Sequence, residues 1–207
     1  MSDQFRFTIL GCGSSGGVPR LPGLWGDCDP ENPKNRRRRC SMLVERIGAE
    51  GTTQASLLSR FSYAFVQPEG SPYPPILDLH TLDGATEVTG PGGPITFHPF
   101  EVNHGAIDAL GFRIGGLAYV PDVAEIPEAV WPMLDGLDIW VVDALRREPH
   151  PTHAHLAKTL EWIERAGPKR AVLTNMHFDL DYATVAAETP DHITPAYDLM
   201  QLTLDAE

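Results

Sequence analysis

Histidines and aspartates stand at the ends of four strands that the second half of the sequence predicts. They are His104, Asp122, Asp143 and His177. Functional sites collect at the carboxyl ends of strands in α/β folds, and neutral imidazole with carboxylate is a ligand set of zinc, manganese or iron. A single histidine in such a place is more often structural than a ligand. Four strand ends that each carry one of these side chains favour a metal or acid–base site.

Three further histidines, His150, His153 and His155, stand at the start of a predicted helix, directly after the strand that ends in Asp143. Imidazole is the side chain whose ordinary pKa lies closest to neutral pH, so a histidine here can transfer protons as well as bind a metal. The residue types leave both roles open.

A glycine-rich segment after the first predicted strand has the spacing Gly-x-Gly-x-x-Gly over residues 11–16. Dinucleotide-binding turns share this spacing, but they open a helix. Pro19 and Pro22 follow so closely that no regular helix can form, so we do not expect a nucleotide cofactor. Either the segment is a turn that lets backbones pack closely, or its N–H groups, together with Ser14 and Ser15, line a site for an anionic substrate.

A run of four arginines, Arg36 to Arg39, is preceded by Lys34, which places five cations within six residues. Such a run can contact phosphate, so Arg36 and Arg37 are candidate substrate-binding residues. Two alternatives stay open at this point. Either the run is a solvated basic loop, or some of its arginines pair with acidic side chains inside the fold.

Apolar–polar alternation and buried apolar runs predict strands at 5–10, 41–47, 76–79, 95–102, 110–114, 116–120, 137–142, 170–174 and 199–204. We expect a turn at 48–53 and helices at 54–65, 127–134, 153–166 and 182–188. Strands and helices that alternate in the second half indicate an α/β fold.

The chain has 207 residues, 42% of them hydrophobic, and a formal net charge of −12. This length predicts a single domain over 1–207, and the charge argues against a general nucleic-acid binder. No apolar run reaches the roughly 18 residues that a membrane span needs, and the first residues lack a secretory pattern, so we expect a cytoplasmic protein without a membrane partner. Three cysteines without a C-x-x-C pair argue against a disulfide framework.

Five runs resemble metallo-β-lactamase-fold hydrolases, in the branch of the phosphoribosyl 1,2-cyclic phosphate phosphodiesterases, which are relatives of ribonuclease Z. The runs are FTILGCGSS (7–15), CDPENPKNRRRRCS (28–41), PHPTH (149–153), LTNMHFDLDY (173–182) and PAYD (195–198). The resemblance implies an α/β fold of the metallo-β-lactamase-like αββα sandwich type. It also implies a metal-dependent hydrolase, a phosphodiesterase that takes a cyclic phosphate or a related small phosphate-containing substrate.

In that family, two divalent metals lie between two β-sheets. The resemblance implies that His104 binds one metal, that Asp122 bridges both, and that His177 binds the other. His153 matches a histidine that assists proton transfer near the leaving group. Paired metals can activate a water and hold both oxygens of an in-line phosphoryl displacement, so Asp122 and His153 are the expected catalytic residues.

The sequence departs from the family at one place. The His-x-His-x-Asp-His signature that supplies about half of the family's ligands is absent, and an internal segment looks deleted near Thr53 and Gln54. We therefore expect an internally truncated sandwich that binds fewer than two ions, zinc or manganese, with activity that is reduced or lost. The lost strands would leave sheet edges exposed, so a homodimer is one expected outcome and a poorly folded product is the other.

Two other functions compete with the enzyme. A non-catalytic remnant would keep the fold and bind a phosphate-bearing ligand without turnover. A nucleic-acid binder built on the arginine run is disfavoured by the net charge of −12.

Overall fold

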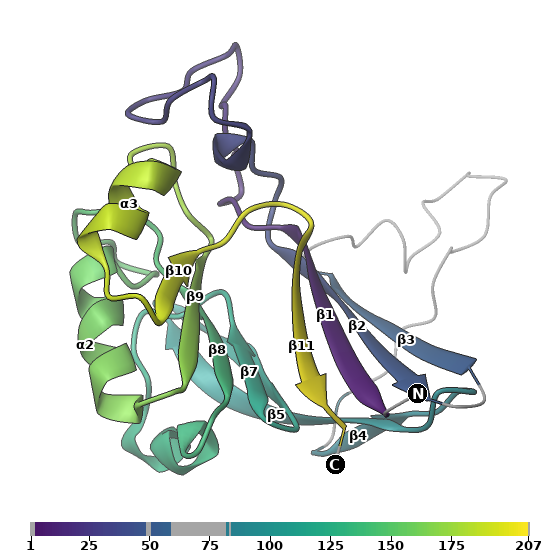
Figure 1. Cartoon of the computed structure of the whole chain (residues 1–207). Helices are drawn as coiled ribbons and strands as arrows, with labels where there is room; N and C mark the ends of the chain where they lie inside the picture. Colours follow the sequence, from purple (N-terminus) through teal and green to yellow (C-terminus); the bar gives the residue numbers. More distant parts are fainter. Residues whose placement is uncertain (1–2, 49–50, 59–81, 83, 207) are drawn as a thin grey trace, which may run out of the picture.

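The chain folds into two β-sheets that pack face to face, with helices beside the larger one (Figure 1). The computed structural model describes residues 3–48, 51–58, 82 and 84–206, with the backbone alone for 51–58. In the described residues, no helix is long and apolar enough to cross a membrane.

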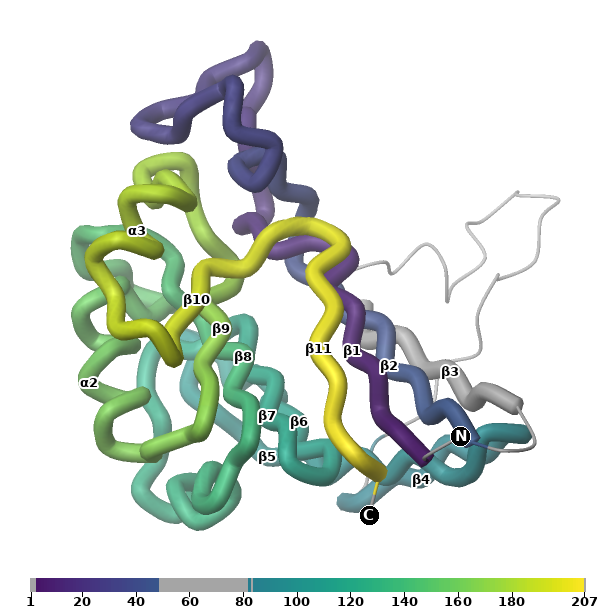
Figure 2. The backbone as a smooth tube through the Cα atoms, in the orientation of Figure 1, coloured from purple at the N-terminus to yellow at the C-terminus, as the bar shows by residue number. Residues whose placement is uncertain are grey.

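The smaller sheet has four antiparallel strands in the order β11-β1-β2-β3. They are β11 (Met200–Asp205), β1 (Gln4–Gly11), β2 (Ser41–Gly48) and β3 (Gly51–Leu58). Because Gln4 pairs with Asp205, the first and last strands lie side by side, and both ends of the chain lie at the same end of this sheet (Figure 2).

The larger sheet has seven strands in the order β10-β9-β8-β7-β6-β5-β4. They are β10 (Ile193–Pro195), β9 (Arg170–Thr174), β8 (Ile139–Asp143), β7 (Leu117–Val120), β6 (Ile107–Ile114), β5 (Ile95–His104) and β4 (Thr86–Val88). The strands from β7 to β10 are parallel, and those from β4 to β7 are antiparallel. As a result β5, β7, β8 and β9 all point the same way, and their carboxyl ends share one edge.

One apolar core joins the two sheets. Phe7 and Met42 of the smaller sheet belong to the same buried cluster as Ile114, Leu117 and Trp140 of the larger one. All five residues of β8 are buried. The apolar run in this strand predicts such burial, because it is typical of a strand that is covered on both faces. Removing this apolar surface from water is the main force that holds the sheets together.

Two helices cover the outer face of the larger sheet, away from the smaller sheet (Figure 1). Helix α2 (Leu156–Ala166) buries Trp162 and Ile163, and it ends at Gly167, whose φ of +61° a residue with a side chain adopts only under strain. Helix α3 (Tyr182–Glu188) is capped by the Asp181 carboxylate. In the described residues, no helix covers the outer face of the smaller sheet, so these residues form the αββ part of the expected sandwich.

The segment between β1 and β2 extends beyond both sheets (Figure 2). It contains the short 3₁₀ helix η1 (Pro33–Asn35). Gly13 pairs with Arg39 within the segment and with Met176 just after β9, so the segment reaches the edge of the larger sheet where its parallel strands end.

Most predicted elements are present, but three predictions were wrong in part. The expected turn at 48–53 and helix at 54–65 are, over 51–58, strand β3, which pairs with β2 along its whole length; the rest of that helix and the strand at 76–79 lie outside the described residues. The helix at 127–134 is the 3₁₀ helix η2 (Glu128–Leu134), because Pro132 lies inside it. The helix at 153–166 starts only at Leu156.

Candidate metal centre

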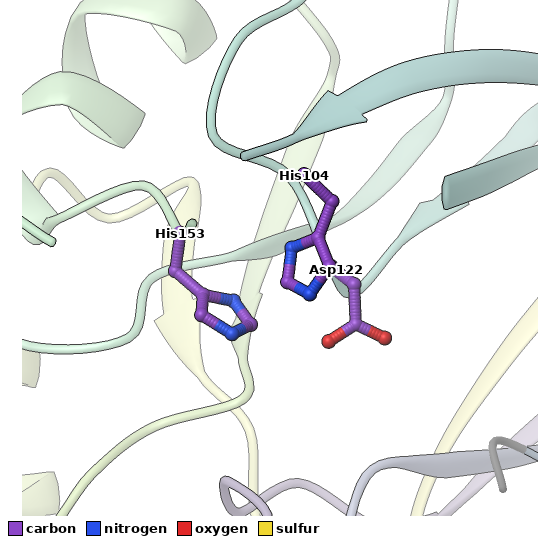
Figure 3. A group of neighbouring side chains, drawn as sticks. All are labelled: His104, Asp122 and His153. Atoms are coloured by element: carbon purple, nitrogen blue, oxygen red, sulfur yellow. The ribbon is translucent and has the colours of Figure 1, made fainter. Parts of the chain in front are cut away.

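Three side chains converge where strands of the larger sheet end (Figure 3). His104 is the last residue of β5, Asp122 follows β7, and His153 lies in the loop between β8 and α2. Each offers one ligand atom, and these atoms all lie within 4.8 Å of one another. The shared direction of β5, β7 and β8 brings together residues that are far apart in the sequence, as the strand-end pattern predicts.

The donor set fits a divalent transition metal. Two imidazoles and one carboxylate are a common protein ligand set of catalytic zinc, which leaves further coordination positions open to water or substrate. His104 is buried, whereas Asp122 and His153 are half-buried, so the group faces a space that a small molecule can reach. Imidazole and carboxylate also suit manganese, so the donor set does not select between these two metals.

A buried carboxylate holds the His153 ring in place. Nδ1 of His153 lies 2.7 Å from Oδ2 of Asp143, at the end of β8, and the amide of Asn175 donates to Oδ1 at 3.2 Å. The backbone N–H of Val123 also donates to Asp143. Burial raises the pKa of Asp143, and these hydrogen bonds act against that rise. A carboxylate behind a histidine is the usual support of a metal ligand, because it fixes the ring and its tautomer.

A cavity of about 500 Å³ opens beside these residues. Its lining is Gly13, Ser14, Ser15, Arg20, Arg39, Cys40, Asp122, Leu145, Arg146, His150, His153, Asn175 and His177. Three arginines contribute to it against one carboxylate, so the cavity is positive although the chain as a whole carries a net charge of −12. Such a concentration of guanidinium groups favours an anionic ligand.

His177 lies on the wall of this cavity but is not one of the three grouped donors. Its Nδ1 is 3.3 Å from Oδ1 of Asp179, and its ring packs on Phe178. Burial, followed by the charge of Arg20, lowers the pKa of His177, which favours the neutral ring. The group of three donors therefore contains two of the three ligands expected from the family resemblance, His104 and Asp122, and its third member is His153. A ligand role for His177 stays a prediction.

The predicted substrate-binding residues divide into two groups. Ser14 and Ser15 line the cavity, and the Ser14 hydroxyl is buried without a hydrogen-bond partner in the described residues; substrate binding by these serines stays a prediction. Arg37 was predicted wrongly, because it is buried and its guanidinium donates to the carbonyl oxygens of His177 and Leu180. Arg36 is exposed and lies over the Trp25 ring outside the cavity lining.

Sequence reasoning gave no individual role to three lining residues, Arg20, Arg39 and Arg146. Arg39 belongs to the arginine run, and its Nε donates to the Ser15 carbonyl oxygen. The Arg20 side chain lies over the Phe178 ring. His150, which the sequence analysis named in the histidine-rich stretch with its role left open, also lines the cavity. Burial, followed by the charge of His153, lowers the pKa of His150.

Comparison with known families identifies the fold. Residues 35–178, well over half of the chain, match the profile of the beta-lactamase superfamily domain. The chain belongs to this family. Its sequence is 24% identical to that of an octanoyltransferase of Porphyromonas gingivalis, over 161 residues or 77% of the chain. The match spans only 32% of that protein, about a third of its length.

Solved structures of the superfamily agree with this membership. A crystal structure of a diphosphatase of the PhnP family superposes with a TM-score of 0.78 and 25% identity, over 96% of this chain and 97% of that one. YhfI of Bacillus subtilis gives a TM-score of 0.68 at 12% identity, over 97% and 99%. Zinc-bound PqqB of Methylobacterium extorquens gives a TM-score of 0.62 at 16% identity, over 95% of this chain and 99% of that one. The chain is a metallo-β-lactamase-fold protein of the PhnP-like branch.

Proposed function

We propose that this protein is a metal-dependent hydrolase that cleaves a phosphodiester bond, such as a cyclic phosphate, in a small molecule. The observation that carries the proposal is the placement of His104, Asp122 and His153 beside a cavity lined by three arginines. Hydrolysis is the reaction class that membership in the superfamily supports. The name of the similar diphosphatase supports a substrate that bears phosphate.

His104, Asp122 and His153 would hold one zinc or manganese ion. A divalent cation at this place supplies Lewis-acid polarisation of a phosphoryl oxygen and activation of a water. One ion, rather than the family's two, follows from the absence of the His-x-His-x-Asp-His signature from the sequence. His104 and Asp122 stand at strand ends of one sheet and His153 lies in the loop after β8, so none of the three donors belongs to that signature.

The chain's own residues bind and orient the substrate. Arg39 and Arg146 line the cavity, and the Ser14 hydroxyl gives a buried donor that has no partner in the described residues. Asp143 and Asn175 hold the His153 ring from behind. A proton-transfer role for His153 at the leaving group stays a prediction, because the ring also belongs to the donor group.

Metal affinity separates the two roles of His153. If the ring is a ligand, His153→Gln lowers zinc affinity and hydrolysis together. If the ring transfers a proton to the leaving group, the variant keeps its zinc and loses turnover by about 10²–10⁴-fold, the range that general acid–base catalysis supplies.

The functional test combines metal content with hydrolysis. The purified chain is loaded with zinc or manganese, its metal content is measured by elemental analysis, and hydrolysis of bis(p-nitrophenyl) phosphate is followed with and without a chelator. We expect one ion per chain, activity that the chelator abolishes, and a loss of activity of about 100-fold or more in His104→Asn. The matched control is His98→Asn, an exposed histidine of the same strand. Unchanged hydrolysis in His104→Asn would contradict the proposal.

A second candidate is a binding module that holds a phosphate-bearing ligand without turnover. It is favoured by the missing signature, whereas the arginine-lined cavity serves both functions equally. The same experiment distinguishes them, because a binding module binds inorganic phosphate but releases no nitrophenol at any metal concentration.

Location and assembly complete the proposal. We propose a cytoplasmic protein, which agrees with its three buried, unpaired cysteines. Strands β11 and β3 form the edges of the smaller sheet in the described residues, and such edges favour pairing with a second copy into a homodimer. Sedimentation equilibrium of the purified chain tests the dimer.

A further inference from the structure

His150 lines the cavity beside the donor group, but it is not one of the three grouped donors. Its ring centroid lies 5.4 Å from that of His153, at an angle of 48°. The two histidines stand three positions apart in one loop, and they face the same cavity. Their hydrogen bonds nevertheless assign them different chemistry.

The tautomer of His150 follows from the backbone. The N–H of Thr152 donates to Nδ1 of His150 at 3.3 Å, and the Thr152 hydroxyl lies 3.2 Å from the same nitrogen. A backbone N–H can only donate, so Nδ1 carries the lone pair and the proton of the neutral ring is on Nε2. The nitrogen left for a ligand is therefore a hydrogen-bond donor.

His153 has the opposite arrangement. Its Nδ1 lies 2.7 Å from Oδ2 of Asp143 and 3.1 Å from the Asn175 amide nitrogen. We assign the shorter contact as a hydrogen bond from Nδ1–H to the Asp143 carboxylate, which leaves the lone pair on Nε2. A lone pair binds a cation, whereas an N–H group binds an anion. Two neighbouring imidazoles thus offer the cavity one group of each kind.

The loop that carries His150 is held on two sides. Thr152 packs against Gly105, just after β5, so closely that a Cβ on Gly105 would lie 2.5 Å from the threonine methyl group. On the other side, the Arg146 guanidinium donates to the carbonyl oxygens of Glu148 and Pro149. The position of His150 is therefore fixed. A residue that contacts one particular ligand atom needs such a fixed position.

We propose that His150 is a substrate-contacting residue that donates a hydrogen bond from Nε2 to an oxygen of the substrate's phosphate, and that it is not a metal ligand. This role rests on the proposed function, because it assumes that the phosphate lies in the arginine-lined cavity. The two histidines then have different roles: His153 binds the cation, and His150 binds the anion.

The test compares two substitutions of His150 by titration calorimetry, with inorganic phosphate and zinc as separate probes. His150→Gln keeps an N–H donor close to the position of Nε2, and His150→Leu removes it at similar volume. We expect phosphate binding about tenfold or more weaker in His150→Leu, as for the loss of a hydrogen bond to a charged group, and within about threefold of the unaltered protein in His150→Gln. Zinc affinity should stay within about threefold in both.

The control is His98→Leu, an exposed histidine of β5 outside the cavity lining, which should change neither affinity. Three results would overturn the inference: phosphate affinity that is unchanged in His150→Leu, zinc affinity that falls in both His150 variants, or no phosphate binding by the unaltered protein. Failure of the proposed function looks different. In that case the unaltered protein hydrolyses no phosphodiester, while the phosphate affinities still follow the expected pattern.

Discussion

Asp181 connects the segment between β1 and β2 to helix α3, and its replacement gives a sharp stability prediction. The carboxylate accepts hydrogen bonds from the backbone N–H of Thr184, the amide of Asn35 at 2.6 Å, and the backbone N–H of Asp29. Burial by itself raises the pKa of Asp181, but these hydrogen bonds and one from the Thr184 hydroxyl outweigh it and lower the pKa to about 2.

The magnitude follows from linkage between protonation and folding. A pKa that falls from the ordinary value of 3.8 in the unfolded chain to about 2 in the fold corresponds to about 2 kcal/mol of stability. Because the folded-state pKa is the lower one, this contribution is complete above about pH 5 and is lost as the pH falls towards 2. Asp181→Asn removes the charge but keeps a side chain that can cap the helix, so the loss measures the charged hydrogen bonds.

Urea unfolding of the unaltered protein and of Asp181→Asn, from pH 7 down to pH 2, measures this contribution. The variant should be less stable by about 2 kcal/mol at pH 7, and the difference should shrink below about 0.5 kcal/mol at pH 2. Asp191→Asn, at an exposed position beyond α3, is the matched control and should show no such trend. A difference between Asp181→Asn and the unaltered protein that stays constant over this pH range would refute the reasoning.

Three further substitutions separate support of the fold from support of the site. Arg37→Met should lower the free energy of unfolding by about 2–3 kcal/mol in urea titrations, since it leaves two carbonyl oxygens without their donor, while phosphate affinity stays unchanged. Asp143→Asn should weaken zinc binding about 10–100-fold in competition with a chelating dye, because the carboxylate holds His153. Thr159→Val should cost about 1–2 kcal/mol on thermal unfolding, since its buried hydroxyl donates to the Asp143 carbonyl oxygen at 2.6 Å, with zinc stoichiometry unaltered.

Strand ends are the part of the site that the sequence predicts well. His104 and Asp122 were found from the apolar segments that precede them, since the direction of a strand fixes where its last residue points. The choice between His153 and His177 as the third donor depends on loop conformations. The loop before α2 is held by Asp143 and Asn175, and neither hydrogen bond is visible in local sequence spacing.

The arginine run shows a second limit of sequence reasoning. In extended chain, successive side chains point to opposite faces, so four identical residues must divide between inside and outside. Arg37 is buried, whereas Arg36, Arg38 and Arg39 are exposed, so alternation by itself does not say which arginine is covered. Identical residues carry no signal about which face is covered. The pairing of Val18 with Arg37 and of Gly13 with Arg39 decides it, and these pairs join residues 19 and 26 positions apart.

Strand β3 was missed for a different reason. Residues 54–58 have apolar residues at spacings that a helix and a strand share over so short a stretch, and local propensity favoured neither strongly. The backbone pairing with β2, from Ser41 opposite Leu58 to Gly48 opposite Gly51, determines the outcome. Tertiary pairing overrides weak local preference in such segments.

Charge distribution sets the class of ligand that such a site can select. The chain carries a net charge of −12, so its surface repels long polyanions, whereas Arg20, Arg39 and Arg146 gather at one cavity with a single carboxylate, Asp122. A divalent cation held by His104, Asp122 and His153 would make that cavity more positive still, since two of its three donors are neutral. A small anion is attracted by the positive charge of the cavity, and it is too small to extend over the negatively charged surface. This charge distribution supports the proposal of a small phosphate-bearing ligand over a nucleic acid.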